Sequence, residues 1–392
     1  MRFFSVMSVA GLVLTQIAAF AQSTPKAQAS ATTEGLRGVY VVSEKVAWAS
    51  GTHGTYLRTT DAGGHWIASI VPGAEALDFR AVVAFSADEA FLMSAGPGEQ
   101  SRIYHTADAG QHWSLQFTNN NPKGFFDSMA FWDSTHGIVL GDPIPDETGT
   151  LKFELLGTDD GQNWHQIPPA NLPAALAGEG AFAASNSCIA ILPPASTSMH
   201  ESGTPARHDP FKQAEPSSEV RIKVVAKPDL NIWFATGGSA ARVFHSADRG
   251  QTWQVVQTPI AHGPDSAGIF SIAFRDALHG VIAGGDYKRP DEDGANLAFT
   301  RDGGKTWTVS RIHPQAYFSA VTYDLKNSRE YDEAVFAVNP SFIFDLRVPA
   351  NPTRVSAGKK AELKFNAVSA FLEGGALFVG PKGTMVSVAA RR

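Results

Sequence analysis

Residues 59–66 read Thr59-Thr60-Asp61-Ala62-Gly63-Gly64-His65-Trp66, and four later segments repeat their pattern, S/T-x-D-x-G-x-x-W. The later copies begin at Thr106, Gly157, Ser246 and Thr300. The five Asp residues stand at positions 61, 108, 159, 248 and 302, so the intervals between them are 47, 51, 89 and 54 residues. Repeats of this length are typical of the four-stranded blades of a β-propeller. The motif therefore predicts one repeat fold rather than several unrelated domains.

Each copy has the residues of a tight turn that leads into a strand. The Asp carboxylate can accept hydrogen bonds from backbone N–H groups, the glycine two residues later tolerates a positive φ, and the Ser/Thr hydroxyl adds a local bond. The final Trp can bury its ring between neighbouring sheets. We therefore assign structural roles to five Asp–Trp pairs, which we call the Asp turns: Asp61 and Trp66, Asp108 and Trp113, Asp159 and Trp164, Asp248 and Trp253, and Asp302 and Trp307. The third copy has Gly157 in the hydroxyl position, so we expect that turn to lose one hydrogen bond.

A second repeat lies between the Asp turns. Residues 129–142 and 272–285 share the pattern x-F-x-D-x-x-H-G-x-x-x-G, which indicates a strand, a turn and a second strand. Weaker copies begin at Val39, Val82, Ala181, Val321 and Val368, which brings the number of copies to seven. We therefore predict an all-β, seven-bladed β-propeller over residues 35–392. The last copy has only three predicted strands, so we expect a strand near Thr33 to complete that blade and remove its open edge.

Two segments fall outside the predicted blades. The N-terminus has Met1-Arg2, an apolar run and small residues at −3 and −1 of a cut after Ala21, which are the features of a signal peptide over residues 1–21. Residues 22–34 are polar and predicted to be disordered, and a Ser/Pro/His/Glu-rich loop insertion is predicted at about residues 195–222. No later stretch approaches the roughly 20 apolar residues of a membrane span. We therefore expect a periplasmic or secreted protein.

The composition limits the classes of partner. Of the 392 residues 43% are hydrophobic, enough for a large core, and 32 basic against 38 acidic residues give a net charge of −6. Because the chain has no long Lys/Arg run, nucleic acid is not an expected partner. The single cysteine, Cys188, cannot form an internal disulfide and lies in an apolar stretch, which favours a buried side chain. We expect a monomer that binds a protein or a carbohydrate.

The Asp turns resemble the Asp-box, or bacterial neuraminidase repeat, which in known families closes the turn between the third and fourth strands of a blade. With the second repeat added, the sequence is similar to the photosystem II stability/assembly factor-like propeller family over roughly residues 35–390. In photosynthetic relatives that fold serves as a binding scaffold for a membrane-protein precursor. The resemblance implies a scaffold role for this chain, and it does not identify the partner.

Loops that join the second and third strands of the blades gather, together with the inter-blade loops, around one end of a propeller channel, which we call the mouth. Strand starts at Arg80, Asp127 and Glu179 are expected at the same end. Polar residues beside Gly-rich turns are poorly placed for core packing and well placed for a ligand. The candidate ligand-binding residues are Asp142, Glu179, Asp286, Tyr287, Arg80 and His53. For Asp142 and Asp286 an equal alternative is that each caps its own turn.

We expect neither a metal site nor an organic cofactor. His136 and His279 hold the same position in two repeats, which marks a turn feature, and no histidine pair has the spacing of a zinc motif. One carboxylate per Asp turn is far below the about six to eight oxygen ligands of Ca²⁺. We also find no G-x-G-x-x-G segment that opens a helix.

Three functions are compatible with the sequence. The first is an exported, non-catalytic scaffold that binds a protein or another ligand, for example in envelope or membrane-protein assembly, because the motifs are turn motifs and no nucleophile–base pair is evident. The alternative is a sialidase-like glycoside hydrolase, which needs an arginine cluster beside a Tyr nucleophile. Parts of that site could come from Arg37, Arg58, Arg80, Arg242 and Tyr287. The third is a propeller-type oxidoreductase, although no quinone-binding motif is recognisable. If the chain is an enzyme, we expect a glycoside hydrolase.

Overall fold

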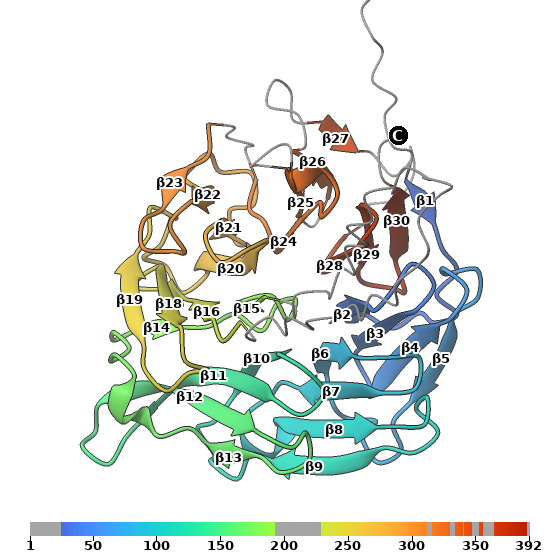
Figure 1. Ribbon diagram of the computed structural model, residues 1–392, viewed down its shortest axis with the longest axis horizontal. Coiled ribbons are helices and arrows are strands. Elements are labelled where there is room, and N and C mark those ends of the chain that lie inside the picture. The colour runs from blue at the N-terminus through green and yellow to red at the C-terminus, as the bar shows by residue number, and fades with distance from the viewer. Residues whose placement is uncertain are drawn as a thin grey trace, which may run out of the picture.

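The computed structural model describes residues 25–192, 229–311, 316–329, 334–339, 341–346, 353–355 and 364–389. Their strands form seven antiparallel sheets arranged in a ring, which confirms the predicted all-β, seven-bladed β-propeller (Figure 1). The predicted signal peptide and the predicted insertion at about residues 195–222 lie outside the described residues. No helix in the described ranges is long and apolar enough to cross a membrane.

In the first three blades four strands follow each other from the channel outward. Blade one contains β2 (Leu36–Val41), β3 (Ala47–Gly51), β4 (Thr55–Thr59) and β5 (Ile67–Ile70); blade two contains β6 (Phe79–Ala84), β7 (Ala90–Ser94), β8 (Arg102–Thr106) and β9 (Ser114–Thr118); blade three contains β10 (Phe126–Phe131), β11 (Gly137–Pro145), β12 (Leu151–Thr158) and β13 (His165–Gln166). Strands β3 and β7 are buried at every position, because neighbouring blades cover both of their faces.

The remaining four blades keep this order with two additions. Blade four contains β15 (Ile189–Ile191), β16 (Ile232–Ala235), β18 (Arg242–Ser246) and β19 (Gln254–Gln257); blade five contains β20 (Ala267–Phe274), β21 (Gly280–Asp286), β22 (Leu297–Thr300) and β23 (Thr308–Val309); blade six contains β24 (Ala320–Tyr323), β25 (Val335–Val338), β26 (Ile343–Asp345) and β27 (Thr353–Val355); blade seven contains β28 (Ala367–Ala370), β29 (Gly375–Val379), β30 (Met385–Ala389) and β1 (Lys26–Ala27). The short strands β17 (Gly237–Gly238) and β14 (Glu179–Gly180) extend the sheet of blade five beyond β20.

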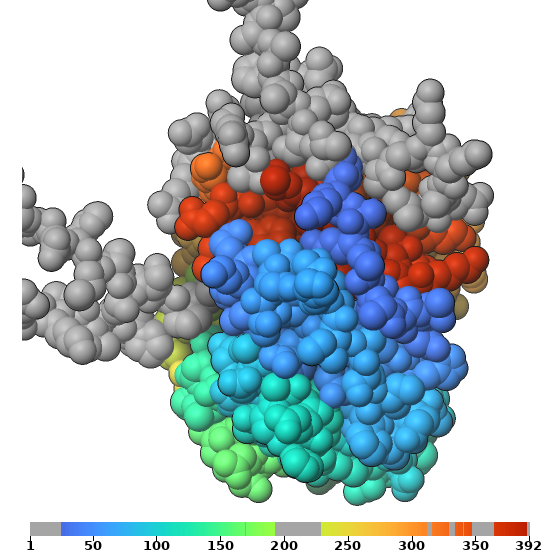
Figure 2. Space-filling view, turned by 90° about the vertical axis from the view of Figure 1, so that its right-hand side faces the viewer, coloured from blue at the N-terminus to red at the C-terminus, as the bar shows by residue number. Residues whose placement is uncertain are grey.

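The first and the last described strands pair with each other in blade seven. Strand β1 pairs antiparallel with β30, with Lys26 opposite Ser387. The Gln28 side chain accepts a hydrogen bond from Nε1 of Trp66, 2.8 Å away, which connects this end of the chain to blade one. Figure 2 shows the junction from the side, with N-terminal residues in blue against C-terminal residues in red. An N-terminal strand thus completes the blade, but it is β1 and not a strand near Thr33, and it lies in the segment for which the sequence predicts disorder.

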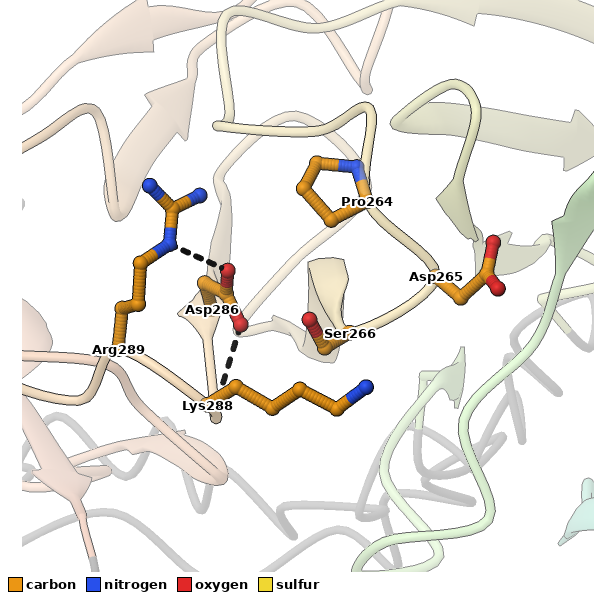
Figure 3. A pocket seen from close by; sticks show the side chains of 6 residues that line it. All are labelled: Pro264, Asp265, Ser266, Asp286, Lys288 and Arg289. Carbon is orange, nitrogen blue, oxygen red and sulfur yellow. Dashed lines mark hydrogen bonds and ion pairs between the residues drawn. The ribbon is translucent and has the colours of Figure 1, made fainter.

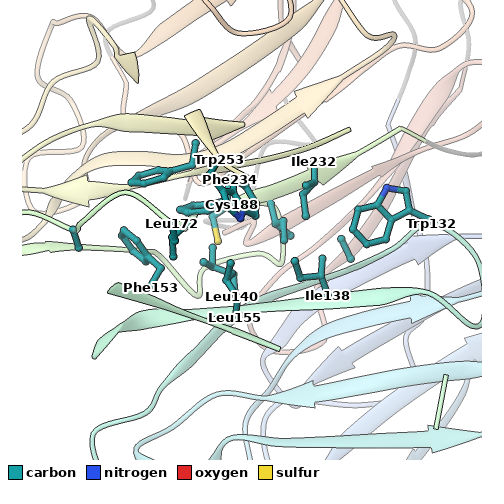
Figure 4. Close-up of a cluster of buried hydrophobic side chains, with 14 residues drawn as sticks. Trp132, Ile138, Leu140, Phe153, Leu155, Leu172, Cys188, Ile232, Phe234 and Trp253 are labelled. Atoms are coloured by element: carbon teal, nitrogen blue, oxygen red, sulfur yellow. The ribbon is translucent and has the colours of Figure 1, made fainter. Parts of the chain in front are cut away.

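Apolar clusters between neighbouring blades hold the ring together. Between blades three and four (Figure 4), Phe153 on β12 packs edge to face against Phe234 on β16, with ring centroids 5.2 Å apart. Cys188 is fully buried in the same cluster, as its apolar context predicts, and burial raises the pKa of its thiol. Between blades one and two, the ring of Trp113 lies 5.1 Å from that of Tyr56. Burial of these rings away from water contributes most of the free energy that stabilises the contacts between blades.

The Asp turns share one set of hydrogen bonds. In the first turn, the Thr59 hydroxyl donates to Oδ1 of Asp61 (2.9 Å) and accepts from the N–H of Gly63 (3.0 Å). The N–H of His65 donates to the same carboxylate (2.8 Å), and these bonds lower the pKa of Asp61 to about 2. Ala62 and Gly63 take the left-handed conformation, with φ of 61° and 78°. Equivalent bonds occur in the turns of Asp108, Asp248 and Asp302.

The third Asp turn differs from the prediction. The Thr158 hydroxyl donates to Asp160, 3.2 Å away, and the N–H of Asn163 donates to the same carboxylate at 2.8 Å. Asp160 is therefore the turn residue instead of Asp159, which is exposed, and Thr158 supplies the hydroxyl that Gly157 lacks. The predicted loss of a hydrogen bond is wrong. The turn is one residue shorter, because it lacks the left-handed residue that lies between Asp and Gly in the other four copies.

Candidate functional site at the channel mouth

The strand order places the candidate residues at one end of the ring. In each blade the start of the first strand and the end of the second lie at the mouth, whereas the Asp turns lie at the opposite end. In four blades a β-bulge interrupts the pairing of the first two strands at the same place. The bulged residues are Arg37, Arg80, Asp127 and Phe270. Because a bulge redirects a side chain and interrupts pairing, these four positions define the inner rim of the mouth.

Residues 181–187, which we call the central segment, cross the channel at this end. The carbonyl of Ala183 accepts a hydrogen bond from Nη1 of Arg80 in blade two, at 3.0 Å. The N–H of Ala181 donates to Oδ1 of Asp142 in blade three, also at 3.0 Å. Asp142 therefore caps a segment far along the chain instead of its own turn.

The central segment also contacts blades five and six. The ring of Phe182 stacks on that of Phe270 in blade five, with centroids 3.9 Å apart. The Ser185 hydroxyl donates to the carbonyl of Ser319, directly before the first strand of blade six, at 3.1 Å. With contacts to four blades, the central segment is held across the axis. The first strand of blade four consequently starts only at Ile189, later than the repeat pattern predicts.

Two arginines share one carboxylate at the inner rim. Asp78 directly precedes β6, and its Oδ2 lies 3.0 Å from Nε of Arg80. Its Oδ1 lies 3.4 Å from Nε of Arg37 in blade one. Arg80 also donates to the central segment, so this candidate residue is bonded to two other parts of the protein.

Blade three contributes three carboxylates, which we call the carboxylate cluster: Asp127 on β10, Asp142 on β11 and Glu154 on β12. Asp127 and Glu154 are buried, while Asp142 is half-buried. Burial raises the pKa of all three carboxyls, and the charge of Asp142 raises that of Asp127 further. Of the three, Asp142 is a ligand-binding candidate from the sequence, and Asp127 is one of the strand starts expected at the mouth. Nothing in the sequence around Glu154 singles it out.

Glu179 is buried within the fold, which does not fit its predicted role as a ligand-binding residue. Its Oε1 accepts hydrogen bonds from Nε of Arg242 (2.8 Å) and from the hydroxyl of Thr236 (2.6 Å). Its Oε2 accepts from the N–H of Leu176 (2.8 Å) and from Nη2 of Arg242. Arg242 also donates to the carbonyl of Ala174 (2.9 Å). The side chains of the pair are 0% and 8% exposed, so we correct the assignment of Glu179 to a structural ion pair between β14 and β18.

Blade five carries an open pocket with a volume of about 540 Å³ (Figure 3). The residues that line it are Pro264, Asp265, Ser266, Asp286, Lys288 and Arg289. Asp286 accepts hydrogen bonds from the N–H of Lys288 and from Nε of Arg289, both at 2.9 Å. Burial acts to raise the pKa of Asp286, but hydrogen bonds from Ser266 and Arg289 lower it below its ordinary value. Asp286 thus caps its own turn, one of the two predicted alternatives, and it also lines the pocket.

Tyr287 lies next to the pocket residues in the chain and is 48% exposed. Its ring meets that of Phe270 edge to face, with centroids 6.1 Å apart. Phe270 also contacts Phe182 and Tyr317, the latter at 5.0 Å. These four rings, which we call the aromatic cluster, connect an exposed side chain to the buried inner rim. Nζ of Lys288 lies 6.0 Å from the centre of the Tyr287 ring.

His53 lies in the turn between β3 and β4, on the rim of blade one. Its Nδ1 is 2.6 Å from Oε2 of Glu34, and this hydrogen-bonded carboxylate raises the pKa of the imidazole. The Thr52 hydroxyl donates to the same oxygen, also at 2.6 Å. His53 is therefore a mouth residue whose partner is Glu34 and not another candidate residue.

Each arginine proposed for a sialidase-like site has another partner in the fold. They are Arg37, Arg58, Arg80 and Arg242. Arg37 and Arg80 share Asp78. Arg58 donates to the carbonyl of Ala87 at 3.1 Å, and Arg242 is buried against Glu179. Among the described residues, no hydrogen bond or ion pair joins any of them to Tyr287.

The histidines that repeat between blades are turn residues. Nδ1 of His136 lies 2.9 Å from Asp133, and Nδ1 of His279 lies 2.9 Å from Asp276, so the same contact occurs between the first and second strands of blades three and five. Within the described ranges of the chain, no group of three or more His, Cys, Asp or Glu side chains has an arrangement that could hold a metal ion.

No family model and no curated protein matches the chain. Among solved structures, the chain is similar to U3-55K, with a TM-score of 0.57 and 10% identity over 94% of this chain and 100% of that one. It is also similar to the WD40 β-propeller domain of Doa1, with a TM-score of 0.54 and 10% identity over 94% and 97% of the two chains. A structure of YCF48 bound to D1 peptide matches over 96% of this chain and 99% of that one, with a TM-score of 0.41 and 15% identity. The first two similarities support the β-propeller fold.

Proposed function

We propose that this chain is an exported, non-catalytic β-propeller scaffold that binds a segment of another protein at its mouth, in the assembly of envelope or membrane proteins. The observation that carries the proposal is the surface formed by the half-exposed Tyr287 and the adjoining pocket. The central segment crosses the channel beside this surface, so a ligand lies across the mouth and not deep on the axis. An extended protein segment fits such a surface.

Tyr287 has the properties of an interface residue. Tyrosines are enriched at protein interfaces, because a rigid ring supplies contact area and the hydroxyl a hydrogen bond. Phe270 supports the ring from below, which limits the entropy lost when a partner covers it. Lys288 and Arg289 add hydrogen-bond donors at the edge of the pocket, and these donors suit the carbonyl and carboxylate oxygens of a peptide.

The sequence supports the same proposal independently. The turn motifs resemble those of a propeller family whose photosynthetic members serve as binding scaffolds, and the signal-peptide features of residues 1–21 support export. N-terminal sequencing of the protein recovered from the cell envelope or the medium tests the export. We expect a start near Gln22, and an uncleaved protein in the cytoplasm would contradict it.

Photo-crosslinking at the mouth tests the binding role. Benzoylphenylalanine replaces Tyr287 in the full chain, expressed in its parent cell, and mass spectrometry identifies the crosslinked peptides. We expect one defined protein segment. The same replacement at Leu278 is the matched control, because Leu278 is 54% exposed and lies at the opposite end of blade five. Identical products from both positions would reject the mouth as the binding surface, and robust turnover of fluorogenic sialosides would favour the hydrolase instead.

A further inference from the structure

The carboxylate cluster is built by two neighbouring bulges. Strand pairing is interrupted at Asp127 between β10 and β11 and again at Asp142 between β11 and β12. Both residues therefore lie at the mouth end of blade three. Glu154 lies opposite Gly141 in the register of β12. A Cβ on Gly141 would lie only 2.7 Å from the carbonyl oxygen of Phe125, so the close approach of the two strands at this point requires glycine.

One oxygen of the cluster is left without a partner. Oδ2 of Asp127 makes no hydrogen bond with any described residue, although the residue is only 1% exposed. Asp142 and Glu154, whose charges act on this carboxylate, are acceptors when ionised and cannot satisfy it. Buried polar atoms without partners are rare in folded proteins, and each one requires an explanation.

The neighbouring cations do not complete the cluster. Arg80 is the cation whose charge acts on Asp127, but its guanidinium is already bonded to Asp78 and to the carbonyl of Ala183. Arg37 also pairs with Asp78. Buried carboxylates in proteins are normally paired with a positive group or saturated with donors. The described residues therefore leave Asp127 without the donor that a positively charged group could supply.

We propose that the carboxylate cluster receives the ammonium or guanidinium group of a Lys or Arg side chain from the bound protein segment. The inference rests on the proposed function, because it names the residue type that anchors that segment. Asp142 is half-buried and so is reached by solvent, whereas Asp127 is 1% exposed. A long flexible stem carries a charged donor past Asp142, where its several N–H groups bond both carboxylates at once.

A bare metal ion fits the cluster less well. Within the described part of the chain, the three carboxylates do not form an arrangement that could hold a metal ion. An ammonium or guanidinium group accepts looser geometry, because its hydrogen bonds span a wider range of directions and distances than coordination bonds.

Short peptides test the proposal on the full chain. Acetyl-Gly-Lys-Gly-amide and its norleucine counterpart, which has an uncharged side chain, are each titrated into the protein and followed by NMR. We expect the lysine peptide to bind at least about tenfold more tightly, because charge-assisted hydrogen bonds are the stronger kind. Asp127→Asn and Asp142→Asn are each expected to remove most of this preference. Asp159→Asn, the same change at an exposed site on the opposite end, is expected to leave it intact.

Three results would overturn the proposal: equal binding of the two peptides, an equal loss of preference in Asp159→Asn, and Ca²⁺ binding that depends on Asp127 without any preference for lysine. The peptide titration and the crosslinking test of the proposed function can fail independently of each other. A lysine preference without crosslinks from position 287 rejects the protein-scaffold role and keeps the cation site. Crosslinks from position 287 without a lysine preference reject the cation site alone.

Discussion

Glu179 and Asp127 are both buried carboxylates near the mouth, yet the fold treats them differently. Glu179 has donors on both of its oxygens, from Arg242, Thr236 and a backbone N–H. Asp127 is at least as deeply buried, but in the described structure one of its oxygens has no donor. Burial alone therefore does not distinguish a structural carboxylate from a candidate ligand-binding carboxylate. The two residues differ in whether hydrogen-bond donors reach both carboxylate oxygens.

Breaking the complete pair should have the largest effect. Glu179→Ala leaves the buried guanidinium of Arg242 without its carboxylate, so we expect the free energy of unfolding to fall by about 3–5 kcal/mol. Denaturant unfolding of the purified chain measures the change. Glu292→Ala is the control, because Glu292 pairs with Arg289 where both side chains are more than half exposed. Exposed pairs contribute little, so the control should barely change. Equal losses in the two variants would break the comparison.

Removing the charge of the incomplete site should have the opposite sign. Burial and the charges of Asp142 and Glu154 raise the pKa of Asp127 well above its ordinary value of 3.8. The folded state thus holds the proton more tightly than the unfolded state, and the protein loses stability as the pH rises from about 4 through the folded-state pKa. We expect Asp127→Asn to be more stable than the wild type by about 1–3 kcal/mol at neutral pH, and about equally stable near pH 4.

Unfolding of both proteins across this pH range provides the measurement. Asp159→Asn should follow the wild type at every pH, because its carboxylate is exposed. A loss of stability in Asp127→Asn at neutral pH would show that the ionised carboxylate has a partner in the fold, and the contrast with Glu179 would disappear.

The smallest effect is expected at the exposed end of the molecule. Asp160 accepts hydrogen bonds from Thr158 and Asn163 in the third Asp turn, so Asp160→Ala removes a complete set of local bonds. We expect a decrease in melting temperature that is smaller than that of Glu179→Ala, since solvent replaces the lost bonds. Asp159→Ala should show no change. The reverse order for the two neighbours would restore the register that the repeat pattern predicts.

The sequence was sufficient for features that depend on local chemistry. The seven copies of the second repeat predicted the number of blades, and the blade-sized intervals between the Asp turns fit it. The place of these turns could be predicted because their hydroxyl, carboxylate and glycine act within a few residues of each other. The one-residue deletion in the third turn shifted the assignment from Asp160 to Asp159, because the pattern fixes Asp by its distance from Trp164 and contains no information on which carboxylate the backbone reaches.

The mouth depends on contacts between distant residues, and the prediction was correspondingly weaker. Glu179 and Arg242 are far apart in the sequence, and only the fold shows that they neutralise each other. Asp127 and Glu154 become neighbours of Asp142 through strand register and two bulges, which residue patterns do not specify. Asp142 and Tyr287 could be placed at the mouth because glycine-rich turns follow the second strands, but their partners could not.

The pairing of β1 with β30 sets a condition on how the protein reaches its final state. Lys26 is synthesised long before its partner Ser387. Closure over such a separation is slow, because the chain entropy is lost before the contact forms. Until then the edges of β1 and β30 stay unpaired, and a copy that lacks either strand never pairs them. Pairing of these edges thereby requires synthesis through β30, and a β1 strand that pairs with β30 of another copy would produce a domain-swapped oligomer.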